Sequence, residues 1–285
     1  KFIFDFLNVN AHAIFKNNWQ TGGGFSYNPF EISNNALRGA SSLRRPIGIG
    51  PNMYINSDTR KKLYASINIG GFSGFEHTVR NRNISLGLVF QPLDALNISL
   101  SGNYSYNWRR QDQFVQNISY NNTTRSIVGQ VTQKTLRFVA RINYNITPDL
   151  TVQYYGQPYI TRPLYSNFAY VSNPMAKQFN DRFHVFTPAE IHYNNGTYSI
   201  DENADAVTDY SFGKPDFNFV QFRSNLVVRW EYKRGSELFL VWSQGNTADA
   251  YNELDTPLFG SLFDNAFAEQ ARNIFLVKWT YRFLK

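Results

Sequence analysis

The stretch TLRFVARINYNITPDLTVQYYGQP, Thr135 to Pro158, decides the fold class of this chain. From Leu136 to Ile146 every second side chain is apolar, and the residues between them are Arg, Val or Asn. A polar turn at Thr147–Asp149 then reverses the chain, and the alternation resumes as far as Tyr154. Because successive side chains of a strand point to opposite faces, the stretch predicts a β-hairpin with one apolar and one polar face.

The same alternation recurs along the chain. It runs without interruption from Leu96 to Trp108, and it returns at Val220–Tyr232 and Phe275–Phe283. On this pattern, strands are predicted near residues 3–15, 18–29, 50–57, 61–73, 78–91, 96–108, 112–120, 123–132, 134–146, 150–162, 217–232, 237–247 and 270–284.

The length of these strands indicates a membrane protein. Most have about ten residues or more, whereas strands of soluble proteins have about five or six. Only a closed barrel satisfies every backbone polar group of a sheet in lipid, and its tilted strands need about 9–11 residues. The sequence therefore predicts an all-β, antiparallel transmembrane β-barrel of the outer-membrane type over residues 1–285, with about 13 strands visible of an even-numbered barrel of at least about 14. A soluble β-sandwich or solenoid is the alternative.

The predicted connections are short on one side of the sheet and long on the other. Short ones lie at Lys16–Asn18, Ser57–Arg60, Pro92–Ala95, Tyr120–Asn122, Thr147–Asp149 and Lys233–Ser236, and long ones at 30–49, 163–216 and 248–269. This asymmetry is typical of short periplasmic turns and long extracellular loops. Because an odd number of strands cannot close evenly, we expect a further strand before Lys1, and thus a longer chain of which these residues are the C-terminal part.

The connection 163–216 is predicted to be a long extracellular loop with a hairpin. Asn195–Gly196 suits the positive φ angles of a type I′ turn, and alternating flanks extend from Glu190 to Ile200. Left in water, the rings of this loop would form an apolar patch. They are Tyr165, Phe168, Tyr170, Phe179, Phe183, Phe186, Tyr193, Tyr198, Tyr210 and Phe212. We expect the loop to bury them against the barrel mouth, where it would narrow the pore, rather than against a partner.

Composition and charge exclude several classes of protein. Aromatic residues make up 17% of the chain and charged residues only 17%, against about 25% charged in an average soluble domain. With no cysteine, disulfide scaffolds and thiolate metal sites are excluded. The net charge is +7, but the basic residues are scattered instead of forming the patch that nucleic-acid binding needs, so no nucleic-acid partner is predicted.

Several motifs resemble a known family. PDFNFVQFRSNLVVRWEYKRGSELFLVWSQG (Pro215–Gly245), ALRGASSLRRP (Ala36–Pro46) and the stretch Gln133–Ile160 are similar to the C-terminal domain of a Bacteroidota outer-membrane family of unknown function. Its members pair an N-terminal carbohydrate-binding family-9-like module with a C-terminal barrel. The resemblance implies the outer membrane of a Gram-negative bacterium, contact with outer-membrane lipid and lipopolysaccharide, and a sugar-binding module that these residues do not contain. It carries over no catalytic residue.

Basic residues are predicted on the inner face of three strands near the C-terminus. They are Arg137, Arg141, Arg223, Arg229, Lys278 and Arg282. Two interpretations stay open. Their charge would favour anions in the lumen, or they would form an internal network with Glu231, Glu237 and loop carboxylates, since charged interiors are usual in such barrels.

One acidic segment partly matches a calcium loop. Asp201, Asn203, Asp205 and Asp209 occupy positions one, three, five and nine of an EF-hand-like pattern, but the glycine at six and the glutamate at twelve are absent. Calcium is thus a candidate ligand, and a solvated acidic loop is the alternative. We predict no other cofactor.

No metal site or enzyme is predicted. His184, Glu190 and His192 are the one close histidine grouping, without HExxH or paired Cys/His spacing. Because the chain also lacks a GxSxG elbow, no catalytic residue is assigned.

Two functions are compatible with these features. The first is passage or binding of a polar solute across the outer membrane, related to glycans through the absent module. The second is a non-conducting structural subunit of a larger outer-membrane complex, which would dock partner outer-membrane proteins through its loops.

The facing of the C-terminal strand can be tested by substitution. Val277 is predicted to face lipid and Thr280 the interior, so Val277→Arg should cost about 2–4 kcal/mol near the midplane, whereas Thr280→Arg should cost far less. The free energy of unfolding from lipid vesicles measures both. Equal tolerance at the two positions would refute the facing.

Overall fold

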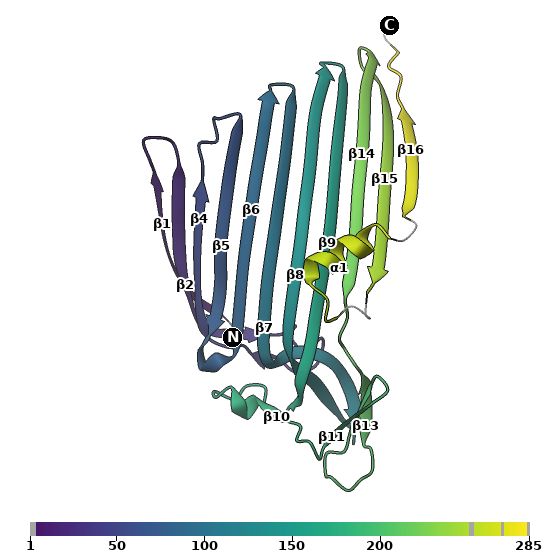
Figure 1. The fold of residues 1–285 in the computed structure, drawn as a ribbon. Coiled ribbons are helices and arrows are strands. Elements are labelled where there is room, and N and C mark those ends of the chain that lie inside the picture. Colours follow the sequence, from purple (N-terminus) through teal and green to yellow (C-terminus); the bar gives the residue numbers. More distant parts are fainter. Residues whose placement is uncertain (1–3, 251–253, 269–270, 284–285) are drawn as a thin grey trace.

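The computed structural model describes residues 4–250, 254–268 and 271–283, which form one wide antiparallel sheet (Figure 1). The strand order is β1-β2-β4-β5-β6-β7-β8-β9-β14-β15-β16, with β3 paired to β2 and β10 to β9. Neighbours in this sheet are mostly neighbours in the sequence, as in a series of hairpins. The all-β, antiparallel fold class and a sheet of thirteen strands are confirmed.

The sheet consists of eleven strands on the main path and two short ones. The main strands are β1 (Phe4–Ile14), β2 (Gln20–Ser33), β4 (Gly48–Asn56), β5 (Leu63–Gly74), β6 (Val79–Leu93), β7 (Leu96–Tyr120), β8 (Thr123–Thr147), β9 (Leu150–Val171), β14 (Phe219–Lys233), β15 (Ser236–Asp249) and β16 (Arg272–Trp279). The short ones are β3 (Leu43–Arg44) and β10 (Phe183–Val185). The ends of the predicted strands 3–15 and 270–284 lie partly outside the described residues.

The remaining elements lie in the long connections. A second sheet contains β11 (Ile191–Asn194), β12 (Thr197–Ile200) and β13 (Tyr210–Gly213). Two 3-10 turns lie at Phe75–His77 and Asn180–Arg182, and one helix, α1, at Leu258–Ala266.

The strand register separates polar and apolar side chains onto two faces. Paired residues of antiparallel strands share a face, and the pairs Asn68↔Ser85, Ser85↔Asn103 and Asn103↔Arg137 carry one face across β5 to β8. We call this the polar face, and the opposite one the apolar face. On the apolar face Leu86 and Val277 remain 52% and 67% exposed. A single layer thus presents most of its large hydrophobic side chains on one side.

Two predicted hairpin strands are continuations of their neighbours. Residues 96–108 and 112–120 form the single 25-residue strand β7, and 123–132 and 134–146 the single 25-residue strand β8. Gln111 has a φ of 39°, and the pairing register shifts between Arg109 and Gln113. A β-bulge absorbs an extra residue without ending a strand, so the prediction of two separate strands at 96–108 and 112–120 was wrong.

The two ends of the sheet differ in the length of their connections. The short connections after β1, β4, β6, β8 and β14 gather at one end (Figure 1). The turn at Tyr120–Asn122 was predicted among them, but it lies at the far end of β7 and β8. The predicted loop start at Pro163 was also wrong, because β9 continues to Val171 and stays paired with β8.

The loop after β9 packs on the extended ends of β7, β8 and β9. The hairpin β11–β12 forms as predicted, with positive φ at Asn195 (44°) and Gly196 (85°). A buried cluster joins the small sheet to the long strands, and its members are Ile127, Phe168, Phe186, Ile200, Tyr210 and Phe212. Most of the loop's rings are therefore buried within this chain, whereas Tyr193 remains 53% exposed.

A buried ion pair fastens another loop to this end of the sheet. Arg45 Nη1 lies 3.1 Å from Asp112 Oδ2, and Arg109 Nη1 lies 3.5 Å from the same oxygen. The Asp112 side chain is almost fully buried. The connection between β2 and β4, which contains Arg45, is thereby tied to β7.

Helix α1 was not predicted from the sequence, and it lies on the apolar face (Figure 1). It buries Leu262 and Ala266 against a cluster that includes Ile160 and Val220. The ring of Phe138 on β8 meets those of Phe259 and Phe263 at 6.2 and 6.0 Å. Among the described residues, no helix is long and apolar enough to cross a membrane.

The sheet has two open edges. β1 and β16 stand at opposite ends of the strand order, and within the described residues no pairing joins them. The N-terminal and C-terminal strands are thus the two edges of the wall.

The ring cluster under β11–β13 can be tested by truncation. Phe212 is buried and lies 5.1 Å from the Phe168 ring and 5.3 Å from the Tyr198 ring. Phe212→Ala should lower the local stability of residues 197–213 by about 3–5 kcal/mol, because it leaves a cavity. Amide hydrogen exchange of this segment measures the loss.

The exposed ring of Tyr193 provides the control. Tyr193→Ala should cost about 1 kcal/mol or less, since little burial is lost. Comparable exchange in the two variants would contradict the packing.

Candidate functional site

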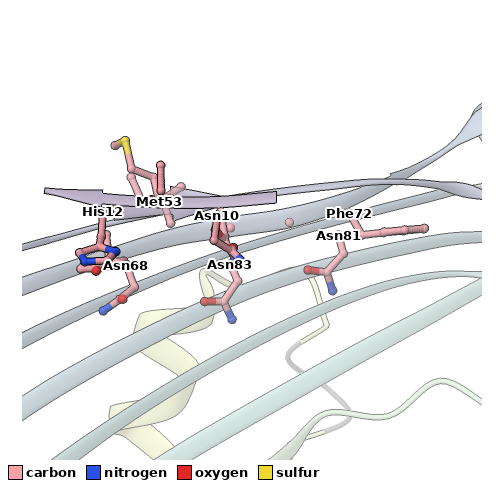
Figure 2. A pocket seen from close by; sticks show the side chains of 14 residues that line it. Asn10, His12, Met53, Asn68, Phe72, Asn81 and Asn83 are labelled. Atoms are coloured by element: carbon pink, nitrogen blue, oxygen red, sulfur yellow. The ribbon is translucent and has the colours of Figure 1, made fainter. Parts of the chain in front are cut away.

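A hollow lies on the polar face between β1 and β6 (Figure 2). Its volume is about 570 Å³. The polar side chains in its lining are Asn10, His12, Asn52, Tyr54, Asn68, Asn81 and Asn83. Figure 2 shows Asn68, Asn81 and Asn83 on one side of the sheet and Met53 on the other. The hollow is therefore rich in amides that both donate and accept hydrogen bonds, beside the imidazole of His12 and the phenol of Tyr54.

Two glycines of β2 make room for these side chains. A Cβ at Gly22 would lie 2.6 Å from the Tyr54 ring, and a Cβ at Gly24 would lie 2.0 Å from Asn10 Oδ1. Both distances are far below van der Waals contact, so Tyr54 and Asn10 would have to move if these positions carried a side chain. The run Gly22–Gly24 thus lets the neighbouring strands lay large polar side chains across β2.

Amide contacts continue along the polar face beyond the hollow. Asn103 Nδ2 donates to Asn83 Oδ1 at 3.2 Å and to Ser85 Oγ at 2.7 Å. Sequence reasoning missed this array because it looked for charged or metal-binding residues. Its signal was present in the alternate positions Asn8, Asn10 and His12 and in the glycine run of β2.

The predicted basic residues lie on the polar face, with one exception. Arg137, Arg141, Arg223, Arg229 and Lys278 share this face through the strand register. Arg282 follows the end of β16 at Trp279, where its N–H donates to Ser236 Oγ at 3.0 Å. The observed strand β16 therefore ends before Arg282, although the predicted strand 270–284 included it, and Arg282 lies beside the turn between β14 and β15.

Their partners divide the basic residues into two groups. Arg229 forms ion pairs with Glu237 and, at 3.6 Å, with Glu231. Arg141 lies 4.8 Å from the centre of the Tyr155 ring, and Lys278 lies 5.5 Å from that of Phe239. Within the part of the chain that the structure describes, Arg137 and Arg223 form no ion pair. An internal network thus exists around Arg229, and the other basic residues leave positive charge on the polar face.

The predicted calcium residues hydrogen-bond within their own loop. Asp201 is buried, and its carboxylate accepts from the N–H groups of Asp205 at 3.1 Å and Ala206 at 2.7 Å. Asp209 accepts from Tyr120 and from the N–H of Glu202, and Asn203 donates to Asp205. Among the described residues no three His, Cys, Asp or Glu side chains are grouped to hold a metal. Calcium binding here stays a prediction.

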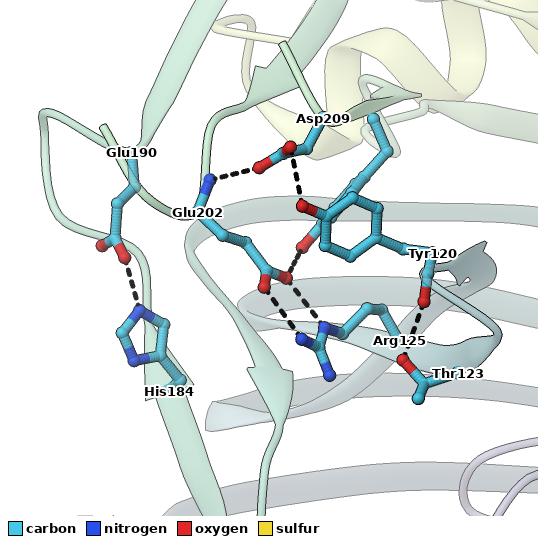
Figure 3. Close-up of polar contacts among 8 residues, drawn as sticks. Tyr120, Thr123, Arg125, His184, Glu190, Glu202 and Asp209 are labelled. Atoms are coloured by element: carbon cyan, nitrogen blue, oxygen red, sulfur yellow. Dashed lines mark hydrogen bonds and ion pairs between the residues drawn. The ribbon is translucent and has the colours of Figure 1, made fainter. Parts of the chain in front are cut away.

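A polar network beside this loop was not foreseen (Figure 3). Arg125 donates two hydrogen bonds to Glu202, at 2.8 and 2.9 Å, and Tyr210 donates to the same carboxylate. Burial and this hydrogen bond raise the pKa of Tyr210 well above its ordinary value. Tyr120 and Asp209 extend the contacts, so the network fastens the small sheet to the β7–β8 hairpin.

His184 and Glu190 come together, but His192 does not join them. His184 Nε2 lies 2.7 Å from Glu190 Oε1 (Figure 3). The N–H of Thr187 donates to Glu190 Oε2 at 2.7 Å. Burial would raise the pKa of Glu190, but the bonds from Thr187 and His184 outweigh it and lower the pKa. His192 is exposed on β11. The pair closes the loop between β10 and β11.

Nearly the whole chain matches one protein-family model. This model, described as "Domain of unknown function (DUF5916)", matches residues 2–284. The chain belongs to this family. The resemblance to a family of unknown function is thereby confirmed, and the match spans both the hollow and the loop network of this DUF5916 chain.

One of the solved structures that the chain matches has a low overall similarity to it. It is named "Copper transporter OprC", with a TM-score of 0.43 and 10% identity to this DUF5916 chain. The match covers 96% of this chain and 41% of that chain, so the chain spans about two-fifths of the length of that structure. No curated protein matches the chain.

The contacts of Glu190 give a pH prediction. A carboxyl whose pKa is lowered by folding stabilises above its unfolded pKa of about 4.3, and this contribution is lost as the pH falls through the lowered value. Residues 183–200 should therefore loosen in acid. Glu190→Gln should loosen them by about 1 kcal/mol at pH 7, because charged hydrogen bonds become neutral ones.

Hydrogen exchange of this segment at neutral and acidic pH measures both effects. Glu237→Gln, at the other end of the sheet, is the control and should leave residues 183–200 unchanged. A segment that is equally protected in the wild type and in Glu190→Gln at every pH would contradict the role of Glu190.

Proposed function

We propose that this chain forms the wall of an outer-membrane β-barrel in a Gram-negative bacterium, and that its polar face lines a passage or a binding surface for a polar solute. The observation that carries the proposal is the separation of faces. The eleven main strands form one layer, with mainly polar side chains such as Asn68, Ser85 and Asn103 on one face and mainly large apolar side chains on the other. A wall between water and lipid needs this arrangement.

The apolar face supports the membrane location. Ile69, Leu86, Leu100, Leu240 and Val277 are each more than a third exposed on it. Soluble monomers rarely expose contiguous apolar patches larger than a few hundred Å², so a face this wide requires lipid or another protein to cover it. Short turns at one end and long loops at the other also match outer-membrane barrels.

The polar face supports a polar solute. The amides around the hollow can donate hydrogen bonds to hydroxyl groups and accept them. The glycines of β2 have no side chains and so leave space on the polar face at this position. The resemblance to a Bacteroidota family with an N-terminal carbohydrate-binding module makes a sugar the first solute to test. The proposal that the connection between β9 and β14 narrows the passage belongs to the same hypothesis, and its burial against β7–β9 is compatible with it.

Ion selectivity tests whether the polar face lines a conducting path. The variant Arg137→Gln, Arg141→Gln, Arg223→Gln removes three positive charges from this face. In planar bilayers that contain the full-length protein, it should lower the preference for chloride over potassium severalfold, measured by the reversal potential in a salt gradient.

A matched variant removes three charges from the opposite face. Arg80→Gln, Arg82→Gln, Lys134→Gln lies on the apolar face by the strand register, and it should leave selectivity unchanged. If the wild type does not conduct, or if the polar-face variant keeps its selectivity, the non-conducting subunit of a larger outer-membrane complex becomes the better description.

A further inference from the structure

Three exposed basic residues stand in a group on the apolar face. Arg80 and Arg82 lie on β6, and Lys134 lies on β8. The register pairs Arg80 with Trp108 and Arg82 with Tyr106, and it pairs Tyr106 with Lys134. Adjacent strands are about 4.8 Å apart, so cations and aromatic rings alternate over three neighbouring strands. We call Arg80, Arg82, Tyr106, Trp108 and Lys134 the basic row.

The basic row lies at one border of the apolar band. Between the short turn after β6 and Arg82, the apolar face shows only apolar side chains: Phe90, Leu88, Leu86 and Ile84. On β8, Leu136 to Ile146 lie between Lys134 and the next short turn. Each span is about ten residues, the length with which a tilted strand crosses the hydrocarbon core. In the proposed barrel the row therefore lies where the outer leaflet meets water.

The cations of the row have no anionic partner in the described part of the chain. Arg80, Arg82 and Lys134 are exposed and form no ion pair there. The guanidinium of Arg82 donates to Asn81 O at 2.7 Å and Ser73 Oγ at 3.2 Å, both neutral. Glu76 lines the same hollow of about 360 Å³ as Arg80, Arg82 and Trp108, but it is not within ion-pair distance. The group thus has excess positive charge beside an open hollow.

The chemistry of the row fits a phosphate at the surface of a membrane. Arg binds phosphate with two parallel hydrogen bonds, and Lys adds a compact charge. Trp and Tyr favour the level of lipid head groups, where one end of the ring is apolar and the other wet. An apolar surface continues directly from the basic row toward the short turns. This surface would contact the acyl chains of a lipid, whereas a soluble anion would make no use of it.

Helix α1 borders the same surface. Phe138 follows Lys134 along the apolar face of β8, and its ring contacts Phe259 and Phe263 of the helix. Phe259 remains 59% exposed. The rings of α1 thus widen the apolar surface beside the basic row, where acyl chains of a bound lipid would lie.

We infer that the basic row binds the phosphate groups of an anionic lipid in the outer leaflet, with the acyl chains on the apolar face below it. This inference rests on the proposed function, because it needs the apolar face to lie against lipid. It assigns Arg80, Arg82 and Lys134 to the head group and Tyr106 and Trp108 to the border between head group and chains.

Binding of lipid A to the full-length protein in detergent micelles tests the inference. The probes are lipid A with two phosphates, the same lipid without phosphate, and inorganic phosphate. The wild type should bind the phosphorylated lipid about 100-fold more tightly than the lipid without phosphate, as expected for three cations at a membrane surface. The triple variant Arg80→Gln, Arg82→Gln, Lys134→Gln should bind the phosphorylated lipid about 100-fold more weakly than the wild type does.

The polar-face variant Arg137→Gln, Arg141→Gln, Arg223→Gln is the matched control and should bind the lipid as the wild type does. The charge-keeping variant Arg80→Lys, Arg82→Lys, Lys134→Arg should retain most of the affinity, which separates charge from packing. Inorganic phosphate at equal concentration should not compete.

Several results would overturn the inference. Equal binding of the two lipids by the wild type would do so without any variant, and so would equal loss in the two charge-removing variants or displacement by inorganic phosphate. If these occur while the polar-face variant still changes ion selectivity, the proposed function stands and only the lipid site is wrong. If the polar-face variant leaves ion selectivity unchanged but the basic row discriminates between the two lipids, the lipid site stands and the conducting polar face is wrong.

Discussion

Antiparallel register is the constraint on which the rest of this structure depends. Paired residues share a face, so the side of one residue determines the side of its partner on the next strand. From Asn68 through Ser85 and Asn103 to Arg137, this relation carries a polar face across strands that are distant in sequence. A shift of the register between two strands by one residue would move the side chains of one strand, such as Leu86 on β6, to the polar face.

Regular strand geometry is interrupted at two places, the glycines of β2 and the register shift in β7, and each has a structural consequence. Gly22 and Gly24 give up side-chain packing on β2, and the space is filled by Tyr54 and Asn10. The irregularity between Arg109 and Gln113 lets β7 continue past the apolar band. It also places Asp112 under Arg45, so that a buried charge holds the neighbouring loop. Removing one member of such a buried pair is costly, because its partner is left without compensation.

The two ends of the wall are stabilised by different interactions. At the end with short turns, tight hairpins and the ion pairs of Arg229 suffice. At the other end, the long connections bury rings such as Phe168 and Phe212 against the extended strands. The carboxylates of Glu202 and Glu190 accept hydrogen bonds from polar groups in the same region. The loop layer is thus a small folded unit with its own core.

The sequence by itself determined the fold class and the facing of the strands, because the period of two in segments such as Leu96–Trp108 is a local property of an extended chain. It also determined the hairpin at Asn195–Gly196, since the φ angles there depend on those two residues. For the candidate site, the face of Arg137, Arg141 and Arg223 followed from the same period.

Only the tertiary structure decided the rest. Whether Arg109–Gln113 ends a strand depends on β8, which stays paired across the irregularity. Helix α1 is too short to be stable alone and depends on Ile160 and Val220 beneath it. The hollow at Asn10 and Tyr54 and the basic row at Arg80, Arg82 and Lys134 each combine residues from several strands. Their proximity is a property of register across the sheet, which no single segment contains.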